Sequence, residues 1–230
     1  MTAEPSIADL FSACVVSRER RIPSAPVELH PEEAACLEGA SPDRLREFAA
    51  GRALAREAAA ELGVQMEALP STPSRMPAWP RDLVGSISHT RRAGLDLCAV
   101  AVARARDLRS IGLDVESRDG VRPRLRRRIL RPDELSGLEP LEAGAADLRA
   151  VLAFSAKEAF YKCQFPLTGR TLGFQAASVR LDLEAGRFVL TLQQDVAAGF
   201  RKGDAFPGRL AVGRSRVATG LEIAATPAAA

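Results

Sequence analysis

The stretch Ile111-Gly112-Leu113-Asp114-Val115-Glu116 decides the fold and carries half of the candidate site. In an extended strand, side chains two residues apart share one face of the sheet. Asp114 and Glu116 therefore project together, while Leu113 and Val115 point into a core. The pattern predicts a strand that buries one face and presents two carboxylates on the other.

A second stretch, Phe154-Ser155-Ala156-Lys157-Glu158-Ala159-Phe160-Tyr161-Lys162, is typical of a helix. Glu158 and Lys162 are then one turn apart on the same stripe, with Lys157 beside them. An ordinary alternative is a helix salt bridge worth about 0.2–0.5 kcal/mol. For the strand, the ordinary alternative is a solvated pair of carboxylates at its end.

Taken together, the two stretches predict a metal site. Three carboxylates are hard oxygen donors with open positions, and Mg²⁺ prefers such donors while it keeps water and substrate phosphate in its shell. The nearby lysines indicate a phosphorylated substrate. The predicted ligands are Asp114, Glu116 and Glu158.

Composition limits the class of protein. The chain has 230 residues, 47% of them hydrophobic, and a formal net charge of +3, so it can bury a substantial core and is no obvious nucleic-acid binder. Its four cysteines have irregular spacing without a Cys-x-x-Cys pair, which predicts reduced packing residues. The longest apolar run, residues 97–103, is too short to span a bilayer. We expect a soluble, cytoplasmic protein that does not bind membranes.

The sequence predicts two long helices. Ser41 and Pro42 predict a helix start, and Gly63 predicts its end after residue 62. The second helix is expected over residues 148–162. Residues 1–40 have four scattered prolines and are expected to be irregular.

Strands surround both helices. Alternation and turn residues predict strands at 83–90, 97–103, 110–116, 179–183, 188–192, 210–212 and 217–223. The sequence therefore predicts an α+β fold with two lobes, each a long helix on a small antiparallel sheet. The expected division is an N-terminal lobe at 1–107, a C-terminal lobe at 108–225 and a disordered tail at 226–230.

An anion-binding side is predicted in the first lobe. Small donors and one imidazole gather at the end of the strand 83–90, including Ser88 and His89. Arginine fits phosphate bidentately, and several arginines accompany them. These are Arg44, Arg52, Arg56 and Arg75. A solvated basic helix face is the alternative, because glutamates interleave with the arginines.

Five ordered motifs over residues 44–174 resemble the 4′-phosphopantetheinyl transferases, in particular the monomeric surfactin- and enterobactin-type branch. They are Arg44-x-Arg46-Glu47-Phe48 with Gly51-Arg52-x-x-Ala55-Arg56, Pro77-x-Trp79-Pro80, Gly85-Ser86-Ile87-Ser88-His89, and the two stretches quoted above. The run Phe165-Pro166-Leu167-Thr168-Gly169-Arg170 strengthens the enterobactin-like assignment. Phe154 stands where many members carry tryptophan.

The resemblance implies an activity, a fold and residue roles. Such enzymes move the phosphopantetheine arm of coenzyme A to a carrier-protein serine and release adenosine 3′,5′-bisphosphate. The implied fold is a two-lobed pseudo-dimer. Mg²⁺ would be held by the three carboxylates, and Lys157 and Lys162 would clamp phosphates. The nucleotide would be held by Arg44, Arg52, Arg56, Arg75, Ser88 and His89. The base that deprotonates the serine is left open between Glu158, a metal-bound water and Lys157.

The partners follow from charge. Carrier proteins are acidic, so the arginine-rich run Arg122–Arg131 is a candidate docking patch, with a solvated face as the alternative. We expect a monomer that binds coenzyme A and no nucleic acid. A metal-dependent nuclease and a non-catalytic nucleotide- or polyanion-binding module are the rival interpretations.

Overall fold

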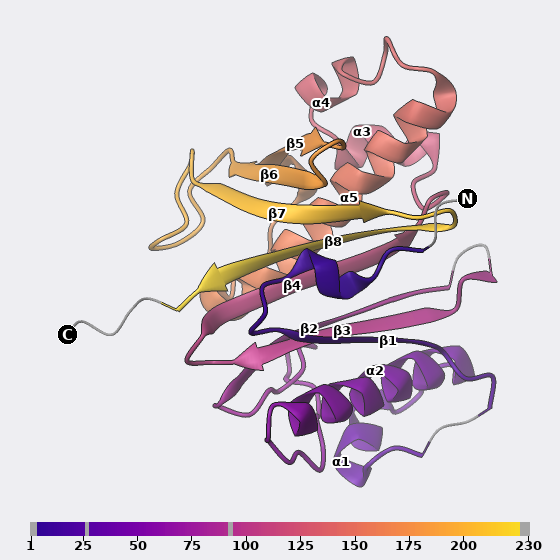
Figure 1. The fold of residues 1–230 in the computed structure, drawn as a ribbon, viewed down its shortest axis with the longest axis vertical. Helices are drawn as coiled ribbons and strands as arrows, with labels where there is room; N and C mark the ends of the chain where they lie inside the picture. The colour runs from indigo at the N-terminus through magenta and orange to yellow at the C-terminus, as the bar shows by residue number, and fades with distance from the viewer. Residues whose placement is uncertain (1–3, 26–27, 92–93, 226–230) are drawn as a thin grey trace.

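The computed structural model describes residues 4–25, 28–91 and 94–225. Two lobes, each a helix on an antiparallel sheet, lie one above the other (Figure 1). The first sheet has the order β1-β3-β2, and helix α2 covers one of its faces. Its elements are β1 (Val16–Arg21), α2 (Pro42–Glu61), β2 (Leu83–Thr90) and β3 (Leu97–Arg104).

The second sheet has the order β4-β8-β7-β6-β5, and the long helix α5 covers it. Its elements are β4 (Leu108–Ser117), α5 (Ala143–Thr168), β5 (Ala177–Asp182), β6 (Arg187–Leu192), β7 (Ala205–Val212) and β8 (Arg216–Ala224). Short helices complete the chain: η1 (Ile7–Leu10), α1 (Pro31–Ala34), η2 (Ala35–Leu37), η4 (Pro123–Leu125), α3 (Arg126–Ile129), α4 (Pro132–Ser136) and η5 (Phe174–Ala176). None of the helices in the described ranges is long and apolar enough to cross a membrane.

The α+β prediction, with one long helix on a small antiparallel sheet in each lobe, is confirmed. The Oγ atom of Ser41 caps α2 by accepting a hydrogen bond from the Arg44 backbone N–H at 3.3 Å. Gly63 follows the helix with φ +72°, as a left-handed stop requires. Helix α5 is longer at both ends than the predicted 148–162. No side-chain cap marks its start, and it passes Pro166 before ending at Gly169, where φ is +64°.

The prediction that residues 1–40 are irregular is wrong for β1. This strand pairs antiparallel with β3, with Val16 opposite Val102 and Arg21 opposite Leu97. Its sequence Val-Ser-Arg-Glu-Arg-Arg has no alternation of apolar and polar residues, because four of its six side chains are exposed at the edge of the sheet. Backbone pairing with a buried neighbour therefore forms the strand without a side-chain pattern.

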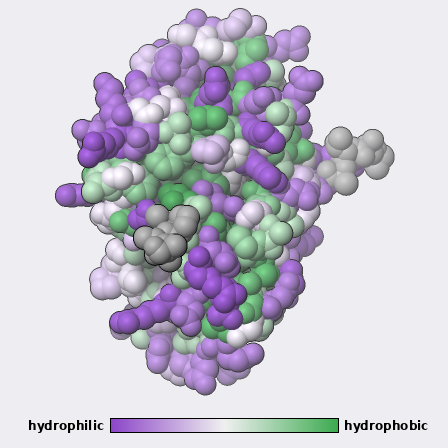
Figure 2. Space-filling model, turned by 60° about the vertical axis from the view of Figure 1, so that its left-hand side comes forward, coloured by the Kyte–Doolittle hydropathy of each residue, from purple (hydrophilic) through white to green (hydrophobic). Residues whose placement is uncertain are grey.

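The lobes share a core where β2 and β4 lie side by side (Figure 1). The hydroxyl of Ser86 accepts a hydrogen bond from the Leu113 N–H at 3.0 Å, and that of Ser88 accepts from the Val115 N–H at 3.2 Å. Side chains of one edge strand thus satisfy backbone donors of the other. Hydrophobic and hydrophilic residues are interspersed on the face in Figure 2, and many of the hydrophobic ones lie near its middle.

The N-terminal segment also crosses between the lobes. Phe11 lies over β8 at Gly220, where an added Cβ would come within 2.7 Å of the Phe11 ring. Leu10 and Phe11 pack in one buried cluster with β3 and β4. The predicted boundary at residues 107/108 falls in the turn between β3 and β4, while the predicted tail 226–230 lies outside the described residues.

Candidate active site

The candidate site lies at the seam between β2 and β4, and Asp114 is at its centre. The ammonium of Lys162 donates to Asp114 Oδ1 at 2.8 Å, to Ser88 Oγ at 2.9 Å and to the Leu113 carbonyl at 3.1 Å. Ser88 Oγ also donates to Asp114 Oδ1 at 3.0 Å. One residue from each of β2, β4 and α5 thus meets in a single polar cluster.

Close packing of α5 on β4 produces this meeting. A Cβ added to Gly112 would lie 2.0 Å from the backbone oxygen of Ala159, so only glycine allows the helix to approach so closely. Glu158 and Lys162 flank this contact on α5, while Asp114 is two residues along β4 from Gly112. Gly112 therefore determines how closely α5, with Glu158 and Lys162, approaches Asp114 on β4.

Two carboxylates, Asp114 and Glu158, lie in the buried part of the site, where Lys162 pairs with one oxygen of Asp114. Asp114 is 3% exposed, and its Oδ2 atom is buried without a hydrogen-bond partner among the described residues. Burial raises the pKa of Glu158, and the charge of Asp114 raises it further, while Lys162 opposes this effect. An orphaned buried oxygen beside a second carboxylate suits a hard divalent cation.

The third predicted ligand is Glu116, two residues after Asp114 on β4. Glu116 lies near Gly120, with its Oε2 atom 3.1 Å from the position of an added Cβ there. Among the described residues, no group of three or more His, Cys, Asp or Glu side chains is arranged to hold a metal ion. The structure thus brings Asp114 and Glu158 together without a preformed set of three ligands.

Lys157 lies elsewhere, in a buried ion pair. Its ammonium is 2.6 Å from Glu134 Oε2 and donates to the Ile129 carbonyl at 2.9 Å. Burial lowers the pKa of Lys157 even though Glu134 opposes that effect. In the described arrangement Lys157 connects α5 to α3 and α4, and it is not brought to Asp114.

A separate charged cluster surrounds Glu47 on α2. Its Oε2 atom is 3.0 Å from His89 Nε2 and 3.3 Å from an Arg44 terminal nitrogen. Nη1 of Arg91 is 3.8 Å from Glu47 Oε1. Burial lowers the pKa of His89 below 6.5, with contributions from Arg44 and Lys162, while Glu47 and Asp114 oppose the shift. Arg44 and His89 lie 3.3 Å apart, between an Arg44 terminal nitrogen and His89 Nε2, and Glu47 contacts both side chains.

The remaining helix arginines are held by structural contacts. Arg52 is 5% exposed and donates to the Leu69 carbonyl at 2.6 Å, and burial lowers its pKa to about 10. Arg56 pairs with the fully buried Glu33 at 2.5 Å. A stripe of free arginines along α2 is therefore not formed.

A pocket of about 330 Å³ lies beside the polar cluster and extends between the lobes. Arg75 and Lys162 line it together with three aromatic residues that sequence reasoning did not place in the site: Trp79, Tyr161 and Phe165. Tyr161 and Phe165 are four residues apart on α5, with ring centroids separated by 5.4 Å. Their helical spacing around Lys162 was the signal that could have found them.

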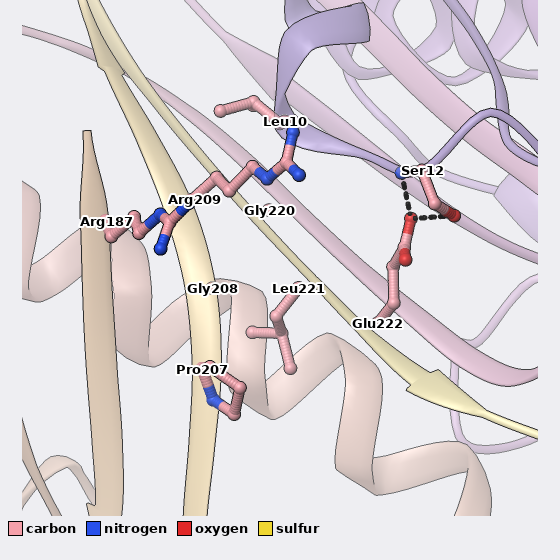
Figure 3. Close-up of a pocket in the computed structure, with 9 residues that line it drawn as sticks. All are labelled: Leu10, Ser12, Arg187, Pro207, Gly208, Arg209, Gly220, Leu221 and Glu222. Carbon is pink, nitrogen blue, oxygen red and sulfur yellow. Dashed lines mark hydrogen bonds between the residues drawn. The ribbon is translucent and has the colours of Figure 1, made fainter. Parts of the chain in front are cut away.

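A second pocket, of about 310 Å³, lies on the outer face of the five-stranded sheet (Figure 3). Arg187 and Arg209 are cross-strand neighbours there, and Ser12 donates two hydrogen bonds to Glu222, as the dashed lines show. None of the predicted site residues lines this pocket. Of these two pockets, the one between the lobes adjoins the candidate site, and a smaller pocket of about 40 Å³ is lined by Lys157 and Glu158.

The predicted docking run divides into two groups. Arg126 pairs with Asp147, and Arg131 donates to the Gln175 carbonyl at 2.7 Å, so both have structural roles. The exposed members are Arg122, Arg124, Arg127 and Arg128. The side chains of this second group are the more exposed ones of the run.

Comparison with known proteins agrees with the two-lobed architecture. Residues 32–103 match the 4′-phosphopantetheinyl transferase N-terminal domain, and residues 110–207 match the 4′-phosphopantetheinyl transferase superfamily. The chain is 37% identical over 206 residues to the 4′-phosphopantetheinyl transferase Svp of Streptomyces mobaraensis, covering 88% of this chain and 82% of that protein.

Two further relatives carry the same description. The chain is 34% identical over 180 residues to the 4′-phosphopantetheinyl transferase Npt of Nocardia iowensis, covering 78% of each chain. It is 34% identical over 163 residues to the 4′-phosphopantetheinyl transferase PptT of Mycobacterium tuberculosis (strain ATCC 25618 / H37Rv), covering 69% of this chain and 70% of that protein. The chain thus belongs to the 4′-phosphopantetheinyl transferase superfamily of enzymes.

Proposed function

We propose that this enzyme transfers the 4′-phosphopantetheine arm of coenzyme A to a serine of an apo acyl or peptidyl carrier protein and releases adenosine 3′,5′-bisphosphate. The observation that carries the proposal is the cluster of Asp114, Lys162 and Ser88 beside the pocket between the lobes, in a chain of this family. A nuclease or a passive polyanion-binding module would not explain the match to both transferase family models.

The pocket supplies the binding role. Trp79, Tyr161 and Phe165 offer apolar surface to the coenzyme, while Arg75 and Lys162 offer charge to its phosphates. Arg44 and His89 would hold the 3′-phosphate at the outer end. Arg52 and Arg56 support this side indirectly, because they fix α2 to neighbouring segments.

Asp114, Glu116 and Glu158 would hold Mg²⁺, which when bound supplies positive charge against the pyrophosphate and the leaving phosphate. In the transfer, the serine oxygen bonds to the phosphorus that bears pantetheine, and the bond from that phosphorus to the bridging oxygen breaks. The serine proton goes to a base. We propose Glu158 for this role, because it lies beside Asp114 on the side of α5 that faces the cluster. Lys157 is confined to its pair with Glu134.

The acidic carrier would meet the exposed arginines of the docking run, namely Arg122, Arg124, Arg127 and Arg128. We propose that the enzyme acts as a cytoplasmic monomer. We also propose that it belongs to the monomeric surfactin- and enterobactin-type branch of the family.

The decisive experiment is incubation of the protein with coenzyme A, Mg²⁺ and an apo carrier protein, followed by intact-mass measurement of the carrier. We expect the carrier to gain one phosphopantetheine group and an equal amount of adenosine 3′,5′-bisphosphate to appear. A carrier whose attachment serine is changed to alanine is the control and should gain nothing. A carrier mass that stays unchanged across several carrier types would contradict the proposal.

A further inference from the structure

Both carboxylate oxygens of Asp114 are closed to a cation arriving from solvent. Oδ1 already accepts hydrogen bonds from Lys162 and Ser88, at 2.8 and 3.0 Å. Oδ2 is buried and has no hydrogen-bond partner among the described residues. A divalent ion therefore cannot reach this carboxylate until a neighbouring group moves.

The group most able to move is the Lys162 side chain. The hydroxyl of Ser88 is fixed by the Val115 N–H across the seam, and the Leu113 carbonyl belongs to strand β4. Lys162 instead reaches the site on a flexible four-carbon stem, and its side chain is 27% exposed. Its ammonium is held by three protein oxygens at 2.8–3.1 Å, much as a small bound cation would be.

Lys162 also lines the pocket between the lobes, so the pocket offers space into which its side chain can turn. An anionic group bound there offers an alternative partner to Asp114. The same side chain thus lies between the carboxylate and the place where phosphates would bind.

We propose that Lys162 is a built-in counterion, which neutralises Asp114 in the metal-free protein and competes with a divalent cation for this carboxylate, so that a phosphate-bearing ligand that draws Lys162 into the pocket favours metal binding. The inference rests on the proposed function for the identity of that ligand. It makes Lys162 a gate on metal binding in addition to any contact that it makes with the substrate. Because the coupling is reciprocal, metal binding also releases Lys162 toward the phosphates.

The test is titration with Mn²⁺ alone, followed by electron paramagnetic resonance, in the absence of coenzyme A and carrier. Lys162→Met keeps much of the side-chain volume and removes the competing charge, so we expect it to tighten Mn²⁺ binding by about tenfold, within the usual range of such couplings. Lys202→Met, at an exposed lysine of the β6–β7 connection, is the matched control and should bind as wild type does. Equal or weaker binding by Lys162→Met would overturn the proposal.

Asp114→Asn checks whether the tighter Mn²⁺ binding of Lys162→Met takes place at Asp114. The double variant Asp114→Asn/Lys162→Met should bind Mn²⁺ no more tightly than Asp114→Asn alone. A gain that persists in the double variant would place the competing site elsewhere and would refute the role of Lys162 at Asp114.

A measurement on the wild-type chain covers the case in which Lys162→Met does not fold. The chain has three lysines, and an amine-reactive acetylating reagent read out by peptide mass spectrometry reports on each of them. We expect saturating Mg²⁺ to raise the modification rate of Lys162 several-fold and to leave Lys202 unchanged. No change at Lys162 would overturn the proposal. Neither measurement uses coenzyme A or a carrier, so either can fail while carrier modification succeeds, and the reverse.

Discussion

The ammonium of Lys157 lies 2.6 Å from Oε2 of Glu134, and both side chains are almost completely buried. Oε1 of the same glutamate accepts a hydrogen bond from the Val179 N–H at 2.6 Å. The pair therefore joins α5, α4 and β5 at the back of the site. A residue that the sequence suggested for phosphate binding is fixed as part of the scaffold.

The first prediction concerns this pair. Lys157→Met should lower the free energy of unfolding by about 3–5 kcal/mol, because the change leaves the Glu134 carboxylate buried without its partner. The double variant Lys157→Met/Glu134→Leu should recover most of the loss, since both charges are gone. Urea unfolding monitored by circular dichroism measures the effect. A single variant within 1 kcal/mol of wild type would show that the pair is dispensable.

The second prediction concerns the close approach of α5 to β4. Gly112→Ala should destabilise the protein by about 1–3 kcal/mol or prevent folding, because the new Cβ would meet the Ala159 carbonyl. Gly144→Ala, in the first turn of α5, is the control, since an added Cβ there meets nothing within 4 Å. Thermal unfolding should show the control unchanged or stabilised by up to about 1 kcal/mol. Equal melting temperatures for both variants would contradict the packing argument.

The third prediction concerns the carboxylates. Asp114→Asn and Glu158→Gln should each lower the rate of carrier modification by about 100-fold or more. Each variant loses a carboxylate ligand of the proposed cation, and that cation would neutralise the pyrophosphate. Both variants should remain folded by circular dichroism. Chelation of divalent ions should produce the same loss in the wild-type enzyme, and full activity in excess chelator would remove the metal from the mechanism.

The fourth prediction concerns pH. Burial lowers the pKa of His89 below 6.5, so the unfolded chain binds this proton more readily than the folded protein does. Stability should therefore fall as the pH drops through 6.5 toward the lowered pKa, and His89→Gln should flatten that dependence. Equilibrium unfolding between pH 5 and 8 measures it.

The fourth prediction has a second part, which concerns ligand binding by the same histidine. If the 3′-phosphate contacts His89, protonation of the ring should accompany binding, so affinity for coenzyme A should rise from pH 8 to pH 6. Calorimetry with 3′-dephospho-coenzyme A is the comparison, and its affinity should depend less on pH. An identical pH dependence for the two ligands would show that His89 does not contact the 3′-phosphate.

The fifth prediction concerns carrier docking. Arg127→Glu/Arg128→Glu should raise the Michaelis constant for the carrier, most strongly at low salt, and should leave that for coenzyme A unchanged. Arg126 is left intact because it pairs with Asp147. Arg201→Glu/Lys202→Glu, an equal charge change in another exposed loop, is the control. If both variants show the same carrier kinetics at every ionic strength, the run Arg122–Arg131 does not dock the carrier and is a solvated basic surface.

Local chemistry alone determined much of the architecture. Ser41, Pro42 and Gly63 define α2 because capping and left-handed geometry act over a few residues. Alternation in residues 83–90 and 110–116 predicts strands because side chains on a pleated strand repeat every two residues. The carboxylates and lysines were also evident from residue type and spacing, and Asp114 with Lys162 is the pair that the structure joins.

Only the tertiary structure decided which of these groups meet. Lys157 and Lys162 stand in one motif, yet one pairs with Glu134 and the other with Asp114, because the contact of Ala159 with Gly112 fixes the rotation of α5 against the sheet. β1 exists because β3 offers it backbone partners, which no side-chain pattern encodes. Arg52 and Arg56 look free on a helix, yet their partners, Leu69 and Glu33, lie in other segments of the chain. Neighbouring residues determine the local backbone geometry, whereas side-chain burial and the choice of ion-pair and strand partners depend on the packing of the whole chain.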